Sequence, residues 1–400
     1  MAAFEIKKNI YWVGAIDWSV RDFHGYSTPA GSTYNAYLVV DRKTVLFDTV
    51  KKPFAGDLIR RIRQVCNPER IDYIVINHVE PDHASALPEV VEVIKPEKII
   101  CSSQGKKGLL AHFHREDWPY EVVKTGDEID IGERTVRFIE TRMVHWPDSM
   151  FSYIPEDKLL ISQDGFGQHW ATSERFDDEV DQSELMYQSA KYYANILLPY
   201  SPVVQRLLAE VRAMGLEIDM IAPDHGLIWR SNPEKILAAW DEWSRQVAKN
   251  KALVVYDTMW RSTEMMARAV ADGLQAEGVS VKVMDLASCH RSDVVTELLD
   301  SKAVLFGSST LNNNMLPRMA DLLCYVKGLR PAPKLAAAFG SYGWGGEAVK
   351  QINAAFEEMK FEIVDPGIRV NYVPTEDDLA KCAELGRNTA KRVIDSLKST

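Results

Sequence analysis

The chain has 400 residues, 46% of them hydrophobic and 26% charged, which is a globular composition and excludes a disordered, collagen-like or wholly coiled-coil protein. Its formal net charge of −10 argues against a broad surface for nucleic acid or for an anionic membrane. The five cysteines never occur in C-x-x-C spacing, which excludes a disulfide scaffold and a four-cysteine metal site and favours free thiols in a reducing cytoplasm.

The length predicts two or three domains. The first 25 residues are interrupted by charges, and no charge-free apolar run reaches 18 residues. We therefore expect no signal peptide, no membrane span and a cytoplasmic location.

Residues 1–250 are expected to form the first domain. Its strands are predicted at 5–13, 35–40, 44–48, 72–76, 98–101, 120–123, 128–131, 134–141, 150–154, 158–162 and 218–222. Its helices are predicted at 54–66, 84–94, 104–114, 186–197 and 201–214, followed by a Trp-rich helical stretch at 233–249. Strand pairs interrupted by helices indicate an α/β/β/α sandwich, in which two packed sheets carry helices on the outside.

Residues 251–400 are expected to form the second domain, because strands and helices alternate from residue 252 onward. Strands are predicted at 252–256, 279–284, 302–307, 334–339 and 361–364. Helices are predicted at 263–276, 291–299, 315–327, 346–359 and 376–397. Five strand–helix pairs in about 150 residues predict a flavodoxin-like, doubly wound parallel sheet.

Four potential metal ligands follow one buried strand within six positions: His78, Glu80, Asp82 and His83. We expect Pro81 to keep this loop from being helical, with a helix starting after it. In an extended backbone His78, Glu80 and Asp82 would point to one side and His83 elsewhere, an arrangement that suits two metal ions side by side.

Three further candidate ligands each follow a predicted strand: His145, Asp164 and His225. Each alone is more often a capping or hydrogen-bonded residue than a ligand. Together with the first cluster they make four histidines and three carboxylates, which would be costly to bury without a cation. Nitrogen and oxygen ligands without thiolate suit iron or manganese better than structural zinc, and Asp164 is the best candidate to bridge two ions.

Three loops at carboxyl ends of strands in the second domain predict a flavin site. Thr258, Ser262 and Thr263 are placed to hold one phosphate at a helix N-terminus, and no dinucleotide or P-loop motif is present. One phosphate loop indicates FMN rather than FAD, with Trp260, Tyr342 and Trp344 as stacking surfaces. The candidate contacts are Thr258, Met259, Trp260, Arg261, Ser262, Thr263, Ser309, Thr310, Asn312, Asn313, Asn314, Ser341, Tyr342, Gly343, Trp344 and Gly345.

The order His78-x-Glu80-x-Asp82-His83, His145, Asp164, His225 resembles the metallo-β-lactamase motif H-x-H-x-D-H…H…D…H, with Glu80 in place of the second histidine. That substitution, joined to a flavodoxin-like domain, is similar to the flavodiiron proteins, also called A-type flavoproteins, of the rubredoxin:oxygen oxidoreductase type. The resemblance covers essentially the whole chain. One departure lies before His225, where Pro-Asp-His stands in place of the more common Pro-Ser-His.

The resemblance implies a function and a ligand set. His78, Glu80 and His145 would hold one iron, Asp82, His83 and His225 the other, and Asp164 would bridge, although the histidine at position 83 need not be bound in this family. It also implies reduction of O2 to water or of nitric oxide to nitrous oxide, the four electrons for O2 coming from two ferrous ions and reduced FMN. A separate rubredoxin or similar small carrier would supply electrons, and a head-to-tail homodimer, or a dimer of dimers, would place the FMN of one chain at the irons of another.

Two alternatives remain open on the residues alone: a binuclear zinc hydrolase with a flavodoxin appendage, and an electron carrier whose first domain only docks partners. Iron rather than zinc in the protein, and a requirement for Asp164 in substrate reduction, would exclude them. His24 and Tyr26 precede the core strands and are candidates for proton donors or for groups that support the metal ligands.

Overall fold

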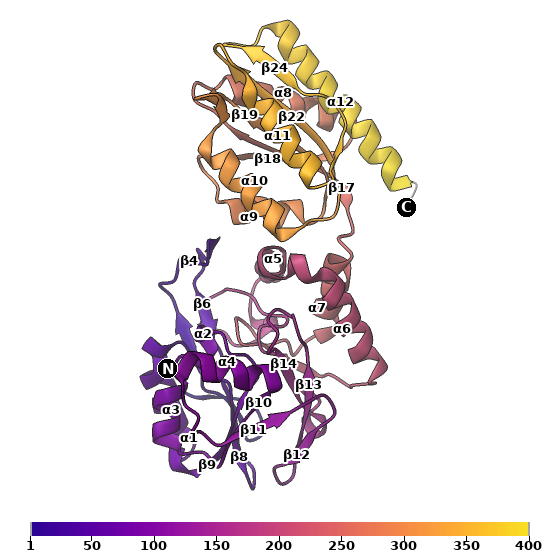
Figure 1. Ribbon diagram of the computed structural model, residues 1–400. Helices are drawn as coiled ribbons and strands as arrows, with labels where there is room; N and C mark the ends of the chain where they lie inside the picture. The colour runs from indigo at the N-terminus through magenta and orange to yellow at the C-terminus, as the bar shows by residue number, and fades with distance from the viewer. Residues whose placement is uncertain (1, 399–400) are drawn as a thin grey trace. The chain divides into compact units, whose positions relative to one another are not determined.

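The computed structural model describes residues 2–398, which divide into two compact units (Figure 1). The first unit comprises residues 2–24, 28–192 and 200–241, and the second comprises 25–27, 193–199 and 242–398. The main division thus falls at residues 241 and 242, a few residues before the predicted boundary at 250.

The first unit is built on two large sheets. The seven-stranded sheet has, in spatial order, β1 (Phe4–Lys7), β2 (Ile10–Trp12), β7 (Tyr37–Val39), β8 (Thr44–Phe47), β9 (Ile71–Ile76), β10 (Lys98–Ser102) and β11 (Tyr120–Val123). The five-stranded sheet has β12 (Glu128–Asp130), β13 (Thr135–Glu140), β14 (Met150–Ile154), β15 (Leu159–Ile161) and β16 (Met220–Ala222). Its helices are α1 (Ala55–Val65), α2 (Pro81–Ala84), α3 (Leu87–Ile94), α4 (Ser103–Phe113), α5 (Gln182–Tyr192), α6 (Ser201–Ala213) and α7 (Pro233–Ser244).

Alternation along the strands builds two cores on opposite faces of the larger sheet. Val45 and Phe47 of β8 pack with Phe138 and Ile161 of the smaller sheet, and this core fills the space between the sheets. Leu46 points the other way and packs with residues of α1, α3 and α4. The predicted sandwich of two sheets with outer helices is therefore confirmed, and it fixes the strand ends that carry polar side chains.

The N-terminal region differs from the prediction. The expected strand at 5–13 is two strands, β1 and β2, because Asn9 adopts a left-handed conformation (φ 61°) and turns the chain between them. Four short strands were missed, since two or three residues carry no recognisable alternation: β3 (Ala15–Asp17), β4 (Asp22–Phe23), β5 (Tyr26–Ser27) and β6 (Ser32–Tyr34).

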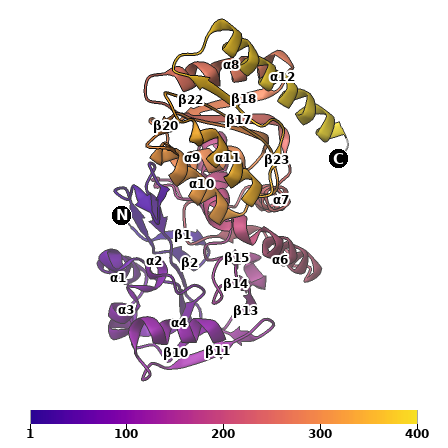
Figure 2. The same ribbon diagram turned by 45° about the horizontal axis from the view of Figure 1, so that its top comes forward.

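The second unit contains a parallel sheet in the order β18 (Ser280–Asp285), β17 (Lys249–Asp257), β19 (Ser301–Ser308), β22 (Leu335–Tyr342) and β23 (Glu362–Ile363). This is the flavodoxin order, and it confirms the predicted fold. On one face lie α8 (Ser262–Ala276) and α12 (Glu376–Lys398), and on the other α9 (Arg291–Leu298), α10 (Pro317–Leu329) and α11 (Glu347–Glu358), as Figure 2 shows.

The last predicted strand differs most in this unit. Only two residues of the expected strand at 361–364 form β23, and the unpredicted β24 (Ile368–Asn371) pairs with the carboxyl-terminal half of β22. A small hairpin of β20 (Thr310–Leu311) and β21 (Asn314–Met315) follows β19. Within residues 2–398 no helix is both long and apolar enough to cross a membrane.

Candidate metal centre and flavin cavity

The loop after β9 differs from the sequence prediction in a way that shapes the site. Pro81 does not prevent a helix; it occupies the first turn of the short helix α2, where the missing proline N–H would have no partner in any case. Asp82 and His83 are therefore helical rather than extended. His83 lies apart from His78 and Glu80, as expected. The expectation that Asp82 would share the side of His78 and Glu80 is wrong, because the helical turn places Asp82 in the second group with His83.

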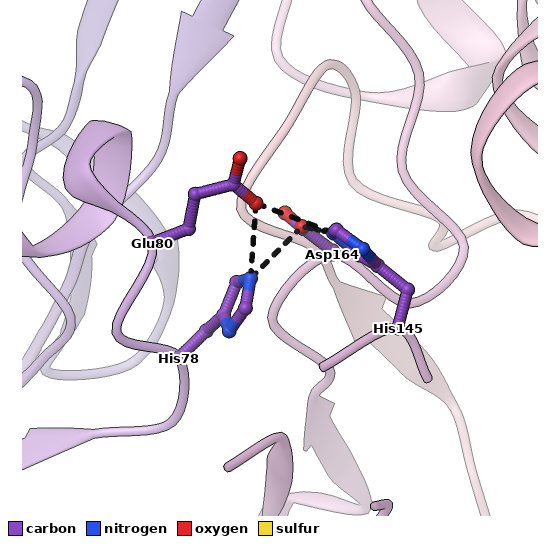
Figure 3. Close-up of side chains that lie close together, drawn as sticks. All are labelled: His78, Glu80, His145 and Asp164. Carbon is purple, nitrogen blue, oxygen red and sulfur yellow. Dashed lines mark hydrogen bonds and ion pairs between the residues drawn. The ribbon is translucent and has the colours of Figure 1, made fainter. Parts of the chain in front are cut away.

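One group of ligand atoms gathers His78, Glu80, His145 and Asp164 (Figure 3). Glu80 Oε2 lies 3.3 Å from Nε2 of both His78 and His145. Asp164 Oδ2 lies 3.4 Å from His78 Nε2 and 2.9 Å from His145 Nε2. Two imidazoles and two carboxylates thus converge from three loops, since His78 and Glu80 share the loop after β9.

A second group gathers Asp82, His83 and His225. Asp82 Oδ2 lies 3.4 Å from His83 Nε2 and 3.1 Å from His225 Nε2. The other carboxylate oxygen of Asp164, Oδ1, lies 2.9 Å from His83 Nε2 and 3.4 Å from His225 Nε2. Asp164 therefore faces one group with each of its two oxygens.

Neighbouring side chains and backbone fix the orientation of these rings. His78 Nδ1 donates to Asp148 Oδ2 at 3.0 Å, and the backbone N–H of Val79 donates to the same oxygen at 2.8 Å. His225 Nδ1 donates to the carbonyl of Thr33 at 2.6 Å. Each bond leaves Nε2 free to face the site, which is how proteins set the tautomer of a metal-binding histidine.

The electrostatics of the first group are those of tightly paired opposite charges. Burial by itself would lower the pKa of His78, but hydrogen bonds with Asp148, Asp164 and Glu80 raise it well above its usual value. Burial would raise the pKa of Asp164, yet the surrounding histidines lower it well below the usual range. The carboxylate is thus held ionised while fully buried, where it needs positive charge.

A second observation, besides the types of residue present, shows that these side chains fit metal ions. Both carboxylate oxygens of Asp82, both ring nitrogens of His83 and Oδ1 of Asp164 are buried and make no hydrogen bond. Their distances to one another are short, but their geometry is not that of hydrogen bonds. Buried polar atoms rarely lack a hydrogen bond, and one physical reason for such a lack is that the atoms bind a cation instead.

The structure places the remaining predicted residues of this region in different surroundings. His24 lies at the mouth of the first group, with Nε2 3.3 Å from Glu80 Oε1 and its side chain 76% exposed. Tyr26 is buried in β5, which belongs to the second unit, and is not a member of either ligand group. His169, which the sequence did not single out as a ligand, is buried and shares a 2.8 Å hydrogen bond with Ser32.

In the second unit, three loops at the carboxyl ends of β17, β19 and β22 surround an open cavity of about 720 Å³. Trp260 and Trp344 stand at it with 88% and 89% of their surface exposed. The predicted contacts that line the cavity are Met259, Trp260, Ser262, Ser309, Thr310, Asn312, Asn313, Ser341, Tyr342, Gly343, Trp344 and Gly345. A planar ligand with one polar tail would fit such a pocket.

The residues around the start of α8, beside this cavity, fit a phosphate. The hydroxyl oxygen of Thr263 lies 3.0 Å from those of Ser309 and Ser341, so three loops meet in one hydroxyl cluster at the start of α8. The hydroxyl of Thr258 is buried and has no hydrogen-bond partner. A phosphate oxygen would supply the missing acceptor at a helix N-terminus that already favours negative charge.

Four predicted contacts do not line the cavity: Thr258, Arg261, Thr263 and Asn314. Arg261 is paired with Glu264 at 2.9 Å, and Asn314 donates to the carbonyl of Asn312 within the β20–β21 hairpin. Three lining residues were missed, namely Leu311, Tyr372 and Val373. Tyr372 and Val373 follow β24, so a prediction of that strand would have placed them at the same sheet edge.

Comparison with known proteins covers both units. Residues 33–226 match the family described as ODP family beta lactamase, and residues 254–386 match the flavodoxin family. A relative from Moorella thermoacetica named nitric oxide reductase is 48% identical over 393 residues, which are 98% of each chain. A relative from Megalodesulfovibrio gigas named rubredoxin-oxygen oxidoreductase is 45% identical over 394 residues, again 98% of each chain.

Solved structures agree with these relatives. The structure described as rubredoxin oxygen:oxidoreductase from the anaerobe Desulfovibrio gigas is 44% identical, with a TM-score of 0.96 and coverage of 99% of both chains. The flavodiiron protein from Giardia intestinalis is 38% identical, with a TM-score of 0.96, and covers 100% of this chain and 98% of its own.

A two-centre metal group on a β-lactamase-like unit, joined to a flavodoxin unit, defines a flavin- and metal-dependent oxidoreductase. Given the identities over the full length, the chain belongs to the flavodiiron protein family, with FMN and a diiron centre as its cofactors. The alternatives of a zinc hydrolase and of a pure electron carrier are not supported by these relatives.

Proposed function

We propose that the two ligand groups hold two iron ions, with His78, Glu80 and His145 on one and Asp82, His83 and His225 on the other. This assignment rests on one observation: the two carboxylate oxygens of Asp164 face different ligand groups. A carboxylate whose two oxygens face both groups could serve two ions at once, and such a pair would supply charge stabilisation to a small bound substrate.

We propose that FMN occupies the cavity of the second unit, with its phosphate near Thr258, Ser262 and Thr263 and its ring beside Trp260, Tyr342 or Trp344. The orphaned hydroxyl of Thr258 and the exposed tryptophans support this placement. Backbone and hydroxyl groups of the loops after β19 and β22 would then hydrogen-bond the polar edge of the ring.

The chemistry proposed is reduction of O2 to water, of nitric oxide to nitrous oxide, or of both, as the names of the relatives suggest. If held by these residues, the irons would supply a binding site for the substrate, and FMN would supply electron transfer from a carrier such as rubredoxin. The chain itself keeps the ligands buried, which excludes bulk water and hinders escape of partly reduced species. His24 is an exposed side chain whose Nε2 lies 3.3 Å from Glu80 Oε1, and it would connect that carboxylate with solvent.

The test is rapid mixing of the fully reduced, iron-loaded protein with O2 and separately with nitric oxide under identical conditions. Faster reoxidation by O2 without released peroxide would define an oxygen reductase, and faster reoxidation by nitric oxide would define a nitric oxide reductase. No reoxidation by either, with two irons and FMN bound, would contradict the proposal.

We further propose that the protein works in the cytoplasm as a head-to-tail homodimer, or as a dimer of dimers, in which the FMN of one chain faces the irons of another. The exposed aromatic rim of the cavity supports an interface there. A variant that is strictly monomeric by sedimentation should keep FMN yet reduce substrate poorly. Full activity in that monomer would contradict the dimer.

A further inference from the structure

Asp224 is a buried carboxylate that the proposed ligand set does not use. It is fully buried, and neither of its side-chain oxygens makes a hydrogen bond. It lies in the Pro-Asp-His segment that departs from the more common Pro-Ser-His. A buried carboxylate without a partner costs several kcal/mol in general, so its retention calls for a physical reason.

The position of Asp224 is fixed by backbone hydrogen bonds on both sides. Its N–H donates to the carbonyl of Gln163 at 2.8 Å, and its carbonyl accepts from the N–H of Asn35 at 2.7 Å. The preceding carbonyl, of Pro223, accepts from Asn35 Nδ2 and from the Tyr37 hydroxyl. The turn is therefore rigid, and the direction of the Asp224 carboxylate is set by the fold.

That carboxylate faces the ring of His83. Asp224 Oδ2 lies 3.4 Å from His83 Nδ1, while Nε2 of the same ring faces Asp164 and Asp82. The main chain of His83 is held as well, since the Thr49 N–H donates to the His83 carbonyl at 3.0 Å. The ring thus lies between a carboxylate behind it and the ligand group in front.

Two other buried carboxylates nearby show what a partner does. Asp48 accepts from the N–H and the side-chain amide of Asn77, both at 2.7 Å, so its oxygens are already occupied. Asp148 accepts from His78 Nδ1 and orients that ring toward the first group. Asp224 has no amide partner such as Asn77 provides. It faces Nδ1 of His83 as Asp148 faces Nδ1 of His78, but at 3.4 Å and without a hydrogen bond, where Asp148 accepts one at 3.0 Å.

We propose that Asp224 is a positioning residue that accepts the Nδ1–H of His83 and so holds His83 Nε2 on the second iron. The inference rests on the proposed ligand set and makes it more specific. It makes iron binding by His83 depend on Asp224, which is not itself a ligand. Partners of this kind raise the basicity of a ligating histidine, and their loss typically weakens metal binding about 10- to 100-fold.

The experiment measures release of iron from the anaerobic, iron- and FMN-loaded protein to an excess of a ferrous chelator. In Asp224→Asn we expect one of the two irons to leave about 10- to 100-fold faster while the other is unaffected. Asp148→Asn, the matched control, should accelerate the other iron. In a His83→Ala background, Asp224→Asn should have no further effect. Unchanged release in Asp224→Asn, or the same acceleration with and without His83, would overturn the proposal.

These outcomes separate the inference from the proposed ligand set. If His83→Ala itself leaves the release of both irons unchanged, the assignment of His83 as a ligand is wrong, and the positioning role is overturned with it. If His83→Ala accelerates one iron and Asp224→Asn does not, only the positioning role is overturned. FMN content and circular dichroism verify the folding of each variant, and Asp224→Ser is a second variant from which the same acceleration is expected.

A measurement on the unmodified protein needs no variant to fold. In a crystal structure of the iron-loaded protein, Asp224 should lie at about 3 Å from His83 Nδ1, within hydrogen-bond distance. A structure in which His83 binds iron while Asp224 turns away from it would overturn the proposal.

Discussion

The metal centre of the first unit and the flavin cavity of the second differ in how complete each is without its ligand. Around Asp164 the ligand atoms are buried and several of them lack hydrogen bonds, so a bound cation would stabilise them. At the flavin cavity the hydroxyls of Ser309 and Ser341 bond that of Thr263 beside it, and the side chains of Trp260 and Trp344 are exposed to solvent. The ligands of an ion must be positioned by the fold, because burying unpaired charge is costly. A large planar ligand instead contributes apolar surface that the cavity covers when it binds.

The strongest way to break this comparison is to remove the residue on which both metal positions depend. Asp164→Ala should lower the rate of substrate reduction at least about 1,000-fold, because bound metals supply several kcal/mol of transition-state stabilisation. Reduction of FMN by the electron donor should be unaffected. Both rates are measured by stopped-flow absorbance, together with iron content.

Asp219→Ala is the control for that variant, since this carboxylate is exposed in the same unit, directly before β16. It should change neither iron content nor rate. Undiminished substrate reduction in Asp164→Ala would show that the metal centre is not the site of reaction and that the protein acts as a carrier.

The next largest effect tests whether the flavin site contains one unsatisfied group. Thr258→Val should weaken FMN binding about tenfold or more, because a hydrogen bond to a charged phosphate is lost. It should not destabilise the FMN-free protein, since this hydroxyl has no partner there. Fluorescence titration with FMN and urea unfolding measure the two quantities.

Thr389→Val provides the contrast, because that buried hydroxyl donates to the carbonyl of Leu385 on α12, away from the cavity lining. It should cost stability without changing FMN affinity. Equal FMN affinity in Thr258→Val and the unmodified protein would mean that the phosphate lies elsewhere.

A smaller effect is expected at the open end of the cavity. Trp344→Ala should weaken FMN binding about fivefold, since stacking on an exposed ring contributes roughly 0.5–1.5 kcal/mol. Trp18→Ala removes an exposed tryptophan of the first unit that does not line the cavity and should have no effect on FMN. If the loss exceeds that of Thr258→Val, the ring rather than the phosphate dominates binding, and the comparison between the two sites must be revised.

The smallest effect on the two sites is expected from Lys334, a buried lysine that belongs to neither of them. Burial lowers the pKa of Lys334 to about 8, and its amine reaches only the carbonyl of Leu299, at 3.5 Å. Lys334→Met should raise the free energy of unfolding at pH 7 by on the order of 2 kcal/mol and leave FMN and iron binding unchanged.

The pH dependence gives the sign of that prediction. Between about pH 8 and the unfolded value near 10.4, the unfolded chain holds a proton on Lys334 that the folded chain has lost, so stability rises with pH. The advantage of Lys334→Met should therefore be largest below pH 8 and shrink as the pH rises toward 10.4. The exposed Lys350→Met is the control, and a pH-independent gain would show that packing, not charge, is responsible.

The fold was largely predictable because both units rest on repeated local patterns. Buried runs such as 252–256 and 303–307 are apolar on both faces, which is typical of a parallel sheet between two layers of helices. β3 to β6 have two or three residues each, too few to show a period, and they form by pairing with one another, β3 with β6 and β4 with β5. β24 likewise forms by pairing with β22, and the residues of β24 alone do not indicate that partner.

For the sites, the sequence by itself determined which chemistry was possible. Histidines and carboxylates after strand ends, and hydroxyl-rich loops after parallel strands, are local facts of residue type and order, and the structure brings all seven candidate ligands into two adjoining groups. Tertiary structure alone decided how they are used. The helical turn at Pro81 brings His83 to the second group, each oxygen of Asp164 faces a different group, and Asp224 lies behind His83. These relations join residues far apart in the chain, so packing rather than sequence spacing fixes their distances.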